Sequence, residues 1–292
     1  MAAAARETHL KSAAHRAKNG LSIRDRFLTL ERRTMLTCDF LAGDPPTPDP
    51  ILVILHQEHS TPGRIAHILA SRGYTLDVRR PRFGNPLPPT LAGHAGAIIF
   101  GGPMSANGEE EFIRREIDWL AVPLSENKPF LGVCLGAQML VRHLGGKVAG
   151  HPRGYVEAGY YPIRPTAAGR TLCPSWPERV YQWHREGVEL PSGSELLAEG
   201  ATFRVQAFRH GSSYGLQFHP EVTQAMMCRW VIGSADRLSL PGAKPPATHF
   251  QDRAVYDFAI RAWLADFLEQ WITAAPRATS RANSIAHAAA AD

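Results

Sequence analysis

The feature that most constrains the fold is the stretch from Pro129 to Leu140, which contains Gly-Val-Cys-Leu-Gly centred on Cys134. An apolar run typical of a buried strand leads up to this cysteine, and Leu135, Met139 and Leu140 continue the run with helical spacing. Small residues two places before and two places after a nucleophile let a strand turn sharply into a helix. The pattern predicts a strand, a tight turn that carries Cys134, and a helix.

Taken alone, Cys134 has two interpretations. The helix that follows would place its positive N-terminal end beneath the sulfur, which favours the nucleophilic thiolate over the thiol. A buried structural cysteine at the end of a strand fits equally well, because free cysteines are often buried.

A second motif some eighty residues later favours the reactive interpretation. The segment Tyr214–Glu221 reads Tyr-Gly-Leu-Gln-Phe-His-Pro-Glu, so His219 and Glu221 lie two places apart. On an extended segment these two side chains leave on the same side. A carboxylate beside an imidazole fixes the tautomer and stabilises the imidazolium, which a base serving a cysteine nucleophile requires.

A third motif, Gly101-Gly102-Pro103-Met104-Ser105, follows a predicted strand at residues 95–100. By itself Gly-Gly-Pro is typical of a plain turn. In open α/β sheets, however, ligands bind beyond the carboxyl ends of the strands, where backbone N–H groups can meet a reacting carbonyl.

Together the three motifs resemble the class I, or triad, glutamine amidotransferase domain, most closely the glutaminase part of GMP synthase, over about residues 51–230. The resemblance implies a catalytic triad of Cys134, His219 and Glu221 and an oxyanion hole formed by the N–H groups of Gly102 and Leu135. The implied reaction needs no cofactor, and no metal is expected because His143, His151 and His210 form no metal-ligand pattern such as His-Glu-x-x-His.

The same resemblance implies residues that contact the substrate. Gly101 and Gln138 are expected beside a bound glutamine. The segment that contains Trp183 and His184 resembles the family's Ser-His-Gly-Asp, which helps to hold the substrate's α-amino and carboxylate groups. Trp183 and Arg185 replace smaller residues there, and His184 has two open roles, as a packing residue or as a site residue.

The expected fold is α/β: a doubly wound, mostly parallel sheet flanked by helices, flavodoxin-like, with a small antiparallel β addition. Early strands are predicted at 51–56, 75–79 and 95–100, with a helix at 61–73 whose N-cap is Thr61. Short β segments at 157–164, 179–183, 195–198 and 203–208 are expected to cover the site as antiparallel strands. Helices are predicted at 222–232 and 250–272, the last with an apolar stripe through Val255, Phe258, Phe267 and Trp271.

Three parts of the chain differ in composition. Residues 1–49 are expected to be a disordered basic leader with a proline-rich linker, residues 50–273 the catalytic domain with its closing helix, and residues 274–292 a disordered tail. An alternative is that the natural protein starts at Met35 and that the first 34 residues are an upstream extension of the reading frame. The first 34 residues hold eight Lys and Arg against three Asp and Glu, and the rest of the chain holds 24 of each. The basic surplus therefore lies in the leader, and no nucleic-acid partner is expected.

Four scattered cysteines without Cys-x-x-Cys spacing indicate reduced thiols and a cytoplasmic protein. No apolar stretch approaches the length of a membrane span, so no membrane partner is expected.

The resemblance implies hydrolysis of the γ-amide of glutamine through a γ-glutamyl thioester on Cys134, which gives glutamate and ammonia. Two enzymatic functions stay open, and they differ in the substrate and in what receives the ammonia. The sequence after Glu221 lacks a pyrophosphate-binding loop, so one expectation is a glutaminase that supplies ammonia to a separate synthetase chain. The alternative is a stand-alone hydrolase of γ-glutamyl peptides, which the larger Trp183 and Arg185 mildly favour. A non-catalytic glutamine-binding or scaffold protein is a further alternative, against which the intact Cys, His and Glu argue.

Overall fold

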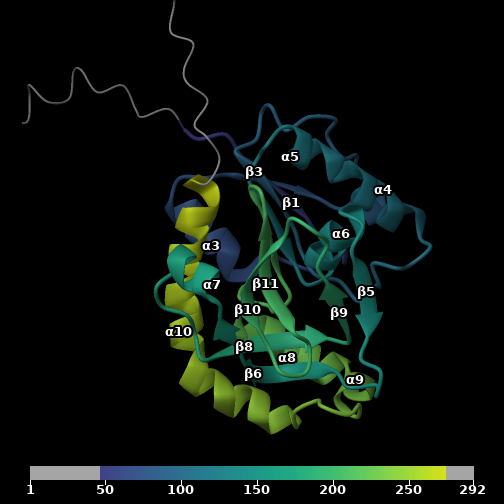
Figure 1. The fold of residues 1–292 in the computed structure, drawn as a ribbon, viewed down its shortest axis with the longest axis vertical. Coiled ribbons are helices and arrows are strands. Elements are labelled where there is room, and N and C mark those ends of the chain that lie inside the picture. Colours follow the sequence, from purple (N-terminus) through teal and green to yellow (C-terminus); the bar gives the residue numbers. More distant parts are fainter. Residues whose placement is uncertain (1–46, 274–292) are drawn as a thin grey trace, which may run out of the picture. The chain divides into compact units, whose positions relative to one another are not determined.

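A computed structural model of the protein describes residues 47–273, and the predictions for the leader and the tail lie outside this range. Labels follow Figure 1. The strands are β1 Ile51–Ile54, β2 Leu76–Arg79, β3 Gly96–Ile99, β4 Phe130–Val133, β5 Lys147–Gly150, β6 Glu157–Pro162, β7 Arg164–Pro165, β8 Arg179–His184, β9 Glu186–Glu189, β10 Glu195–Glu199, β11 Val205–His210 and β12 Ser213–Leu216. The helices are α3 Gly63–Ser71, α4 Glu111–Trp119, α5 Ala121–Ser125, α6 Leu135–His143, α7 Ala167–Leu172, α8 Gln224–Gly233, α9 Ala235–Leu238 and α10 Pro246–Thr273, with a 3₁₀ turn at Pro81–Phe83.

The central sheet has the strand order β2-β1-β3-β4-β12-β11-β10-β7. Its first five strands run parallel, and β11, β10 and β7 continue it antiparallel. The pairs β5–β9 and β6–β8 form two small antiparallel sheets. The order β2-β1-β3-β4 is that of the flavodoxin-like doubly wound sheet, which confirms the predicted fold class.

Helices cover both faces of this sheet, as Figure 1 shows, with α3, α7 and α10 on one side and α4, α5 and α6 on the other. The residues of β1 alternate between these two layers. Ile51 and Val53 pack with α3 and α10, whereas Leu52 and Ile54 pack with α4 and α6. A parallel strand that is buried on both faces has this continuous apolar sequence.

Two of the predicted antiparallel segments lie elsewhere than expected. We expected the segments at 195–198 and 203–208 to cover the site, but they form β10 and β11 and extend the central sheet. Strand β11 pairs with β12. Without β11, β12 would be an edge strand with unpaired backbone groups. The segments at 157–164 and 179–183 form the separate β6–β8 sheet.

The predicted start of α3 was wrong. The N-cap is Pro62 and makes no side-chain capping bond, so Thr61 does not cap the helix. The reason lies in tertiary contact: Gly63 has a φ of +57°, and a Cβ there would overlap the carbonyl oxygen of Glu221. The N–H of Arg64 donates to that oxygen at 3.0 Å, so the helix begins where it meets Glu221.

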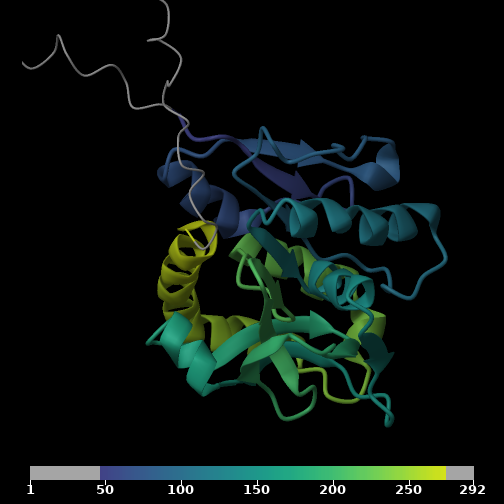
Figure 2. The ribbon, with the colours of Figure 1, turned by 45° about the horizontal axis from the view of Figure 1, so that its top comes forward.

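The apolar stripe of α10 was predicted correctly only in its second half. Phe267 and Trp271 are fully buried, but Val255 and Phe258 are 68% and 81% exposed. Figure 2 shows the C-terminal part of this helix, in yellow, beside α3. In the middle of the helix the inward face carries Tyr256, which packs with Tyr160, and Asp257, which pairs with Arg64, so Val255 and Phe258 lie on the solvent side. Within the described residues, no helix has the length and apolar character needed to cross a membrane.

Candidate active site

Cys134 is the single residue between β4 and α6, and it forms the sharp turn that the sequence predicted. Its backbone has φ 51° and ψ −104°, a conformation that non-glycine residues rarely adopt. The N–H of Cys134 donates to the carbonyl of Leu216 on β12 at 2.7 Å, and its own carbonyl accepts from Gln138 at 3.0 Å. The turn is therefore held from both sides.

The glycines that flank the turn leave no room for a side chain. A Cβ at Gly136 would overlap the carbonyl oxygen of Ile99 on β3, and one at Gly132 would lie 2.5 Å from backbone atoms of Gly136. Because these close approaches involve backbone, neither position accommodates a larger residue without moving α6 against the sheet.

His219 and Glu221 follow β12 and lie beside this turn. The Nδ1–H of His219 donates to Oε1 of Glu221 at 2.8 Å, and the two residues are 4% and 2% exposed. The backbone N–H of His219 donates to the carbonyl of Tyr181 on β8 at 2.8 Å, which ties the loop to the small sheet. This arrangement orients Nε2 as the nitrogen that remains available for proton transfer.

Charge neighbours favour the imidazolium form of His219. Burial, the largest single influence, lowers its pKa, while the charges of Glu221 and then Cys134 raise it, with a net rise from 6.5 to about 10. The direction follows from two anionic partners around one buried ring. His219 is therefore protonated at neutral pH when Cys134 is a thiolate.

Gly101 and Gly102 lie directly over these side chains. A Cβ at Gly101 would lie 2.8 Å from Cε1 of His219 and 3.4 Å from Cβ of Cys134, and one at Gly102 would lie 3.2 Å from Cδ2 of Leu135. The N–H groups of Gly102 and Leu135 donate to no protein acceptor within residues 47–273. Two unsatisfied backbone donors beside a cysteine are the arrangement that an oxyanion requires.

A cavity of about 540 Å³ opens onto this group of residues. Among the residues that line it are Gly101, Gly102, Cys134, His219 and Glu221, together with Trp183, Trp230, Arg82, Arg229 and Arg237. The sequence therefore pointed to five of the cavity residues through its motifs and to Trp183 through the resemblance.

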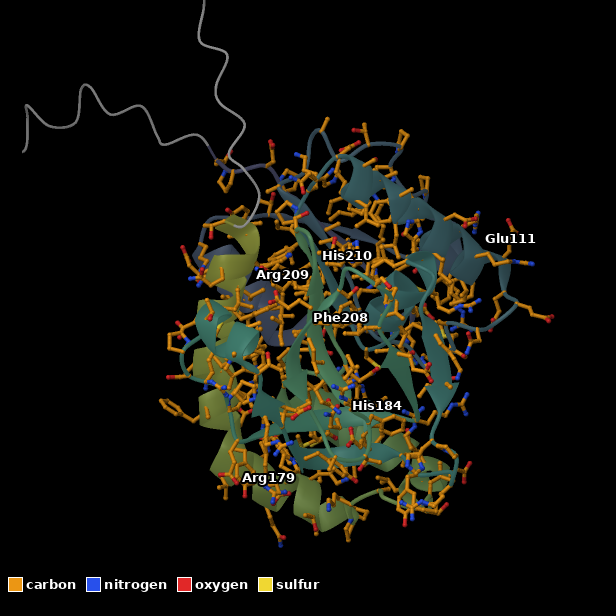
Figure 3. The ribbon with its side chains drawn as sticks, in the orientation of Figure 1. Glu111, Arg179, His184, Phe208, Arg209 and His210 are labelled. Atoms are coloured by element: carbon orange, nitrogen blue, oxygen red, sulfur yellow. The ribbon has the colours of Figure 1, made fainter. Side chains whose placement is uncertain are left out.

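Two of the expected substrate residues lie outside this cavity lining. Nε2 of Gln138 donates to the carbonyl of Glu186 at 3.0 Å and to Oε1 of Gln217 at 3.3 Å. His184 lies in the interior on β8 (Figure 3), where its ring nitrogens contact the carbonyl of Glu186 at 2.9 Å and Oε2 of Glu157 at 3.0 Å. Both residues are 3% exposed, and both contact the carbonyl of Glu186 at the start of β9.

Arg237 is a cavity residue that sequence reasoning missed. Its Nη1 donates to the carbonyl of Trp183 at 3.0 Å, and its guanidinium lies over the Trp183 ring, 5.7 Å from the centroid. Burial lowers the pKa of Arg237, the charge of Cys134 raises it, and Arg185 lowers it, with no carboxylate acting on it. The short segment around Arg237 has no pattern that predicts a position beside Cys134.

His56 is a second residue that the sequence analysis did not identify. It is fully buried at the end of β1, with Nδ1 at 3.2 Å from the carbonyl of Gly101 and Nε2 at 2.7 Å from Oε2 of Glu116. Its place at the carboxyl end of a parallel strand was the available signal, because ligand sites gather there.

The described residues contain no cluster of three or more His, Cys, Asp or Glu arranged to hold a metal ion. Glu109, Glu110 and Glu111, at the start of α4, do not form such a site either. Glu111 lies at the periphery in Figure 3, and its side chain is 78% exposed.

Comparison with known proteins gives consistent matches. The family model described as glutamine amidotransferase class-I matches residues 53–228. The chain is 33% identical over 164 residues to one of the subunits of the glutamine-hydrolysing GMP synthase of Ignicoccus hospitalis, covering 54% of this chain and 78% of that protein. It is 29% identical over 180 residues to the glutamine amidotransferase-like protein YfeJ of Salmonella typhimurium, covering 58% and 74% of the two chains. The crystal structure of a glutamine amidotransferase from Thermotoga maritima matches with a TM-score of 0.70 at 28% identity, covering 77% of this chain and 98% of that one.

Proposed function

The chain belongs to the class-I glutamine amidotransferase family, and we propose that it hydrolyses the γ-amide of glutamine to glutamate and ammonia through a thioester on Cys134. The observation that carries this proposal is the cavity floor, where Cys134 lies beside a His219 that Glu221 holds at 2.8 Å. A cysteine, a base and a group that orients the base are the minimum for nucleophilic acyl transfer.

In the proposed reaction, the thiolate of Cys134 attacks the carboxamide carbon and the C–N bond breaks after a tetrahedral intermediate forms. His219 gives its proton to the departing nitrogen, which leaves as ammonia. The base form of His219 then takes a proton from water, and the resulting hydroxide attacks the thioester carbon. Glutamate leaves, and the thiolate and the imidazolium are restored.

The oxyanion of each tetrahedral intermediate would lie against the N–H groups of Gly102 and Leu135. Their lack of other acceptors within the described residues supports this role. Each such donor contributes about 3 kcal/mol to the stability of the transition state.

We assign the α-carboxylate of the substrate to Arg237. This guanidinium lines the cavity, is held by Trp183, and has no carboxylate partner among residues 47–273. A partly buried, unpaired guanidinium binds a carboxylate strongly because the pairing recovers the interactions lost on leaving water.

For the ammonia, we propose a separate synthetase chain as the acceptor. The supporting observation is the similarity to the GMP synthase protein of Ignicoccus hospitalis, whose name describes it as one part of a glutamine-hydrolysing enzyme made of more than one kind of chain.

A second candidate function is hydrolysis of γ-glutamyl peptides without a partner. The size of the cavity favours it: about 540 Å³ is within the range of roughly 300–1,000 Å³ that holds drug-sized ligands, and glutamine is much smaller. The extra space would hold the residue that follows the γ-glutamyl group.

The test is release of glutamate by the purified chain from glutamine and from a γ-glutamyl dipeptide, with Cys134→Ser as the control. We expect turnover by the wild type and none by the variant. Preference for the dipeptide would establish the second candidate, and binding of glutamine with no turnover of either substrate would overturn both.

A further inference from the structure

His56 and Glu116 form a buried pair that the proposed mechanism does not use. Nε2 of His56, at the end of β1, lies 2.7 Å from Oε2 of Glu116 on α4, and both side chains are 0% exposed. Burying such a pair costs desolvation energy that the contact recovers only in part. A contribution to the site would account for keeping it there.

The other nitrogen of His56 connects the pair to the site. Nδ1 lies 3.2 Å from the carbonyl oxygen of Gly101. A carbonyl oxygen only accepts hydrogen bonds, so Nδ1 carries a proton and donates. Donation from Nδ1 is compatible with two protonation arrangements of the pair: a Glu116 carboxylate accepts from Nε2–H of an imidazolium, or a Glu116 acid donates to the bare Nε2 of the neutral Nδ1–H tautomer.

The carbonyl of Gly101 belongs to the same planar trans peptide as the N–H of Gly102, so the two bonds point in opposite directions. Fixing the oxygen therefore also fixes the direction of the N–H. Without such a contact, a Gly-Gly peptide rotates easily because neither residue has a Cβ that restricts φ and ψ.

Packing supports the same conclusion. A Cβ at Gly102 would lie 3.1 Å from Cβ and 3.3 Å from Cγ of His56, so the His56 ring lies directly against the peptide that it would orient. Gly102 also lines the cavity, and the same added Cβ would lie 3.2 Å from Cδ2 of Leu135, so Gly102 lies between His56 and Leu135.

We propose that His56, held by Glu116, is a positioning residue that locks the Gly101–Gly102 peptide with the Gly102 N–H directed at the oxyanion. This inference rests on the proposed function for its kinetic consequence, but the peptide orientation is a structural claim in its own right. A rotated peptide would present the Gly101 oxygen to the oxyanion, which would repel it.

The experiment compares His56→Leu, His56→Asn and Glu116→Gln with wild type, and uses His67→Leu, an exposed histidine on α3, as the matched control. Three quantities are measured: kcat and KM for glutamine, the rate of Cys134 alkylation by iodoacetamide, and the thermal midpoint. Iodoacetamide reacts by displacement of iodide at a saturated carbon, so it reports the thiolate and forms no oxyanion.

We expect His56→Leu to lower kcat roughly 10²–10³-fold, the loss typical of one oxyanion donor, with KM and the alkylation rate within a few-fold of wild type. His56→Asn keeps an N–H near the position of Nδ1 and should recover much of kcat. Glu116→Gln can donate to a bare Nε2 and should also retain most activity.

Two kinetic results would overturn the inference. One is a wild-type kcat in His56→Leu. The other is a parallel fall of kcat, alkylation rate and thermal midpoint, because that would assign His56 to structural support alone.

The failure of the proposed function is distinguishable from the failure of this inference. If wild type and Cys134→Ser both release no glutamate, the function fails, and crystal structures of wild type and His56→Leu decide the inference. A turned or split Gly101–Gly102 peptide in the variant supports the positioning role, and an unchanged peptide overturns it.

Discussion

His219 and Glu221 lie two residues apart and share a buried hydrogen bond of 2.8 Å between Nδ1 and Oε1. Glu221 is in turn fixed by its own backbone, whose carbonyl accepts from the N–H of Arg64 at the start of α3. The orientation of the imidazole thus depends on a helix that follows β1, far from the histidine in sequence.

The first prediction concerns the alkaline limit of activity. The pKa of His219 is raised to about 10, so its acid form persists through neutral pH and is lost only as the pH rises through that value. We expect kcat/KM, whose pH dependence reports the pKa values of the free enzyme, to fall with a midpoint near pH 10. In Glu221→Gln the carboxylate charge no longer raises the pKa of His219, so the alkaline side of the pH–rate profile should move to lower pH. Rates measured from about pH 6 to about pH 11 check this; identical limbs in both proteins would contradict it.

The second prediction concerns Arg237. Loss of a charged hydrogen bond to the α-carboxylate costs about 1.5–3 kcal/mol, so Arg237→Met should raise KM for glutamine roughly 10- to 100-fold with little change in kcat. With γ-aminobutyramide, which is glutamine without the α-carboxylate, wild type and variant should have equal kcat/KM. Arg204→Met, at an exposed arginine with a 79% exposed side chain, is the control. An equal loss with both substrates would remove Arg237 from carboxylate binding.

The third prediction concerns the different reactivity of the Cys134 and Cys173 thiols. Burial, and then the charge of Asp266, raise the pKa of Cys173 to about 11, so its thiol stays protonated at neutral pH. We expect a limiting amount of iodoacetamide to modify Cys134 and leave Cys173 unmodified, as measured by mass spectrometry of peptides. Modification of Cys173 at a comparable rate would contradict the prediction.

The fourth prediction tests the tight turn around Cys134. Gly136→Ala places a methyl group against the carbonyl oxygen of Ile99, and overpacking of this kind typically costs 1–3 kcal/mol of the free energy of unfolding. We expect a lower denaturant midpoint and loss of turnover. Gly93→Ala, where no atom lies within 4 Å of the added Cβ, is the matched control and should leave both unchanged. Equal stability of the two variants would refute this account of the turn.

The sequence predicted best what depends on neighbouring residues. The strand, turn and helix around Cys134 follow from Gly132 and Gly136 and from the apolar run before them, and the parallel half of the sheet follows from continuous apolar strands. The attachment of β10 and β11 to β12 is a choice between sheet edges, which short-range patterns do not encode.

The same limit applies to the site. Arg237 reaches the cavity only because α9 packs beside β8, and His56 meets Gly101 only because β1 and β3 are adjacent. Gln138 lies one helical turn after Cys134, as its spacing indicated, but its amide finds buried partners in Glu186 and Gln217. Sequence spacing located the helix face, whereas tertiary packing determined what the amide contacts.

The unusual backbone of Cys134 links chemistry to the integrity of the whole fold. A residue at φ 51° and ψ −104° stores about 1–3 kcal/mol that only the surrounding packing sustains. On heating, any loosening of α6 against the sheet would release this strain first, by letting the cysteine relax. The thiol would then move away from the oxyanion donors while the sheet is still formed. Activity should therefore be lost at a lower temperature than the sheet unfolds. The backbone conformation of Cys134 would then set the highest temperature at which the protein is active.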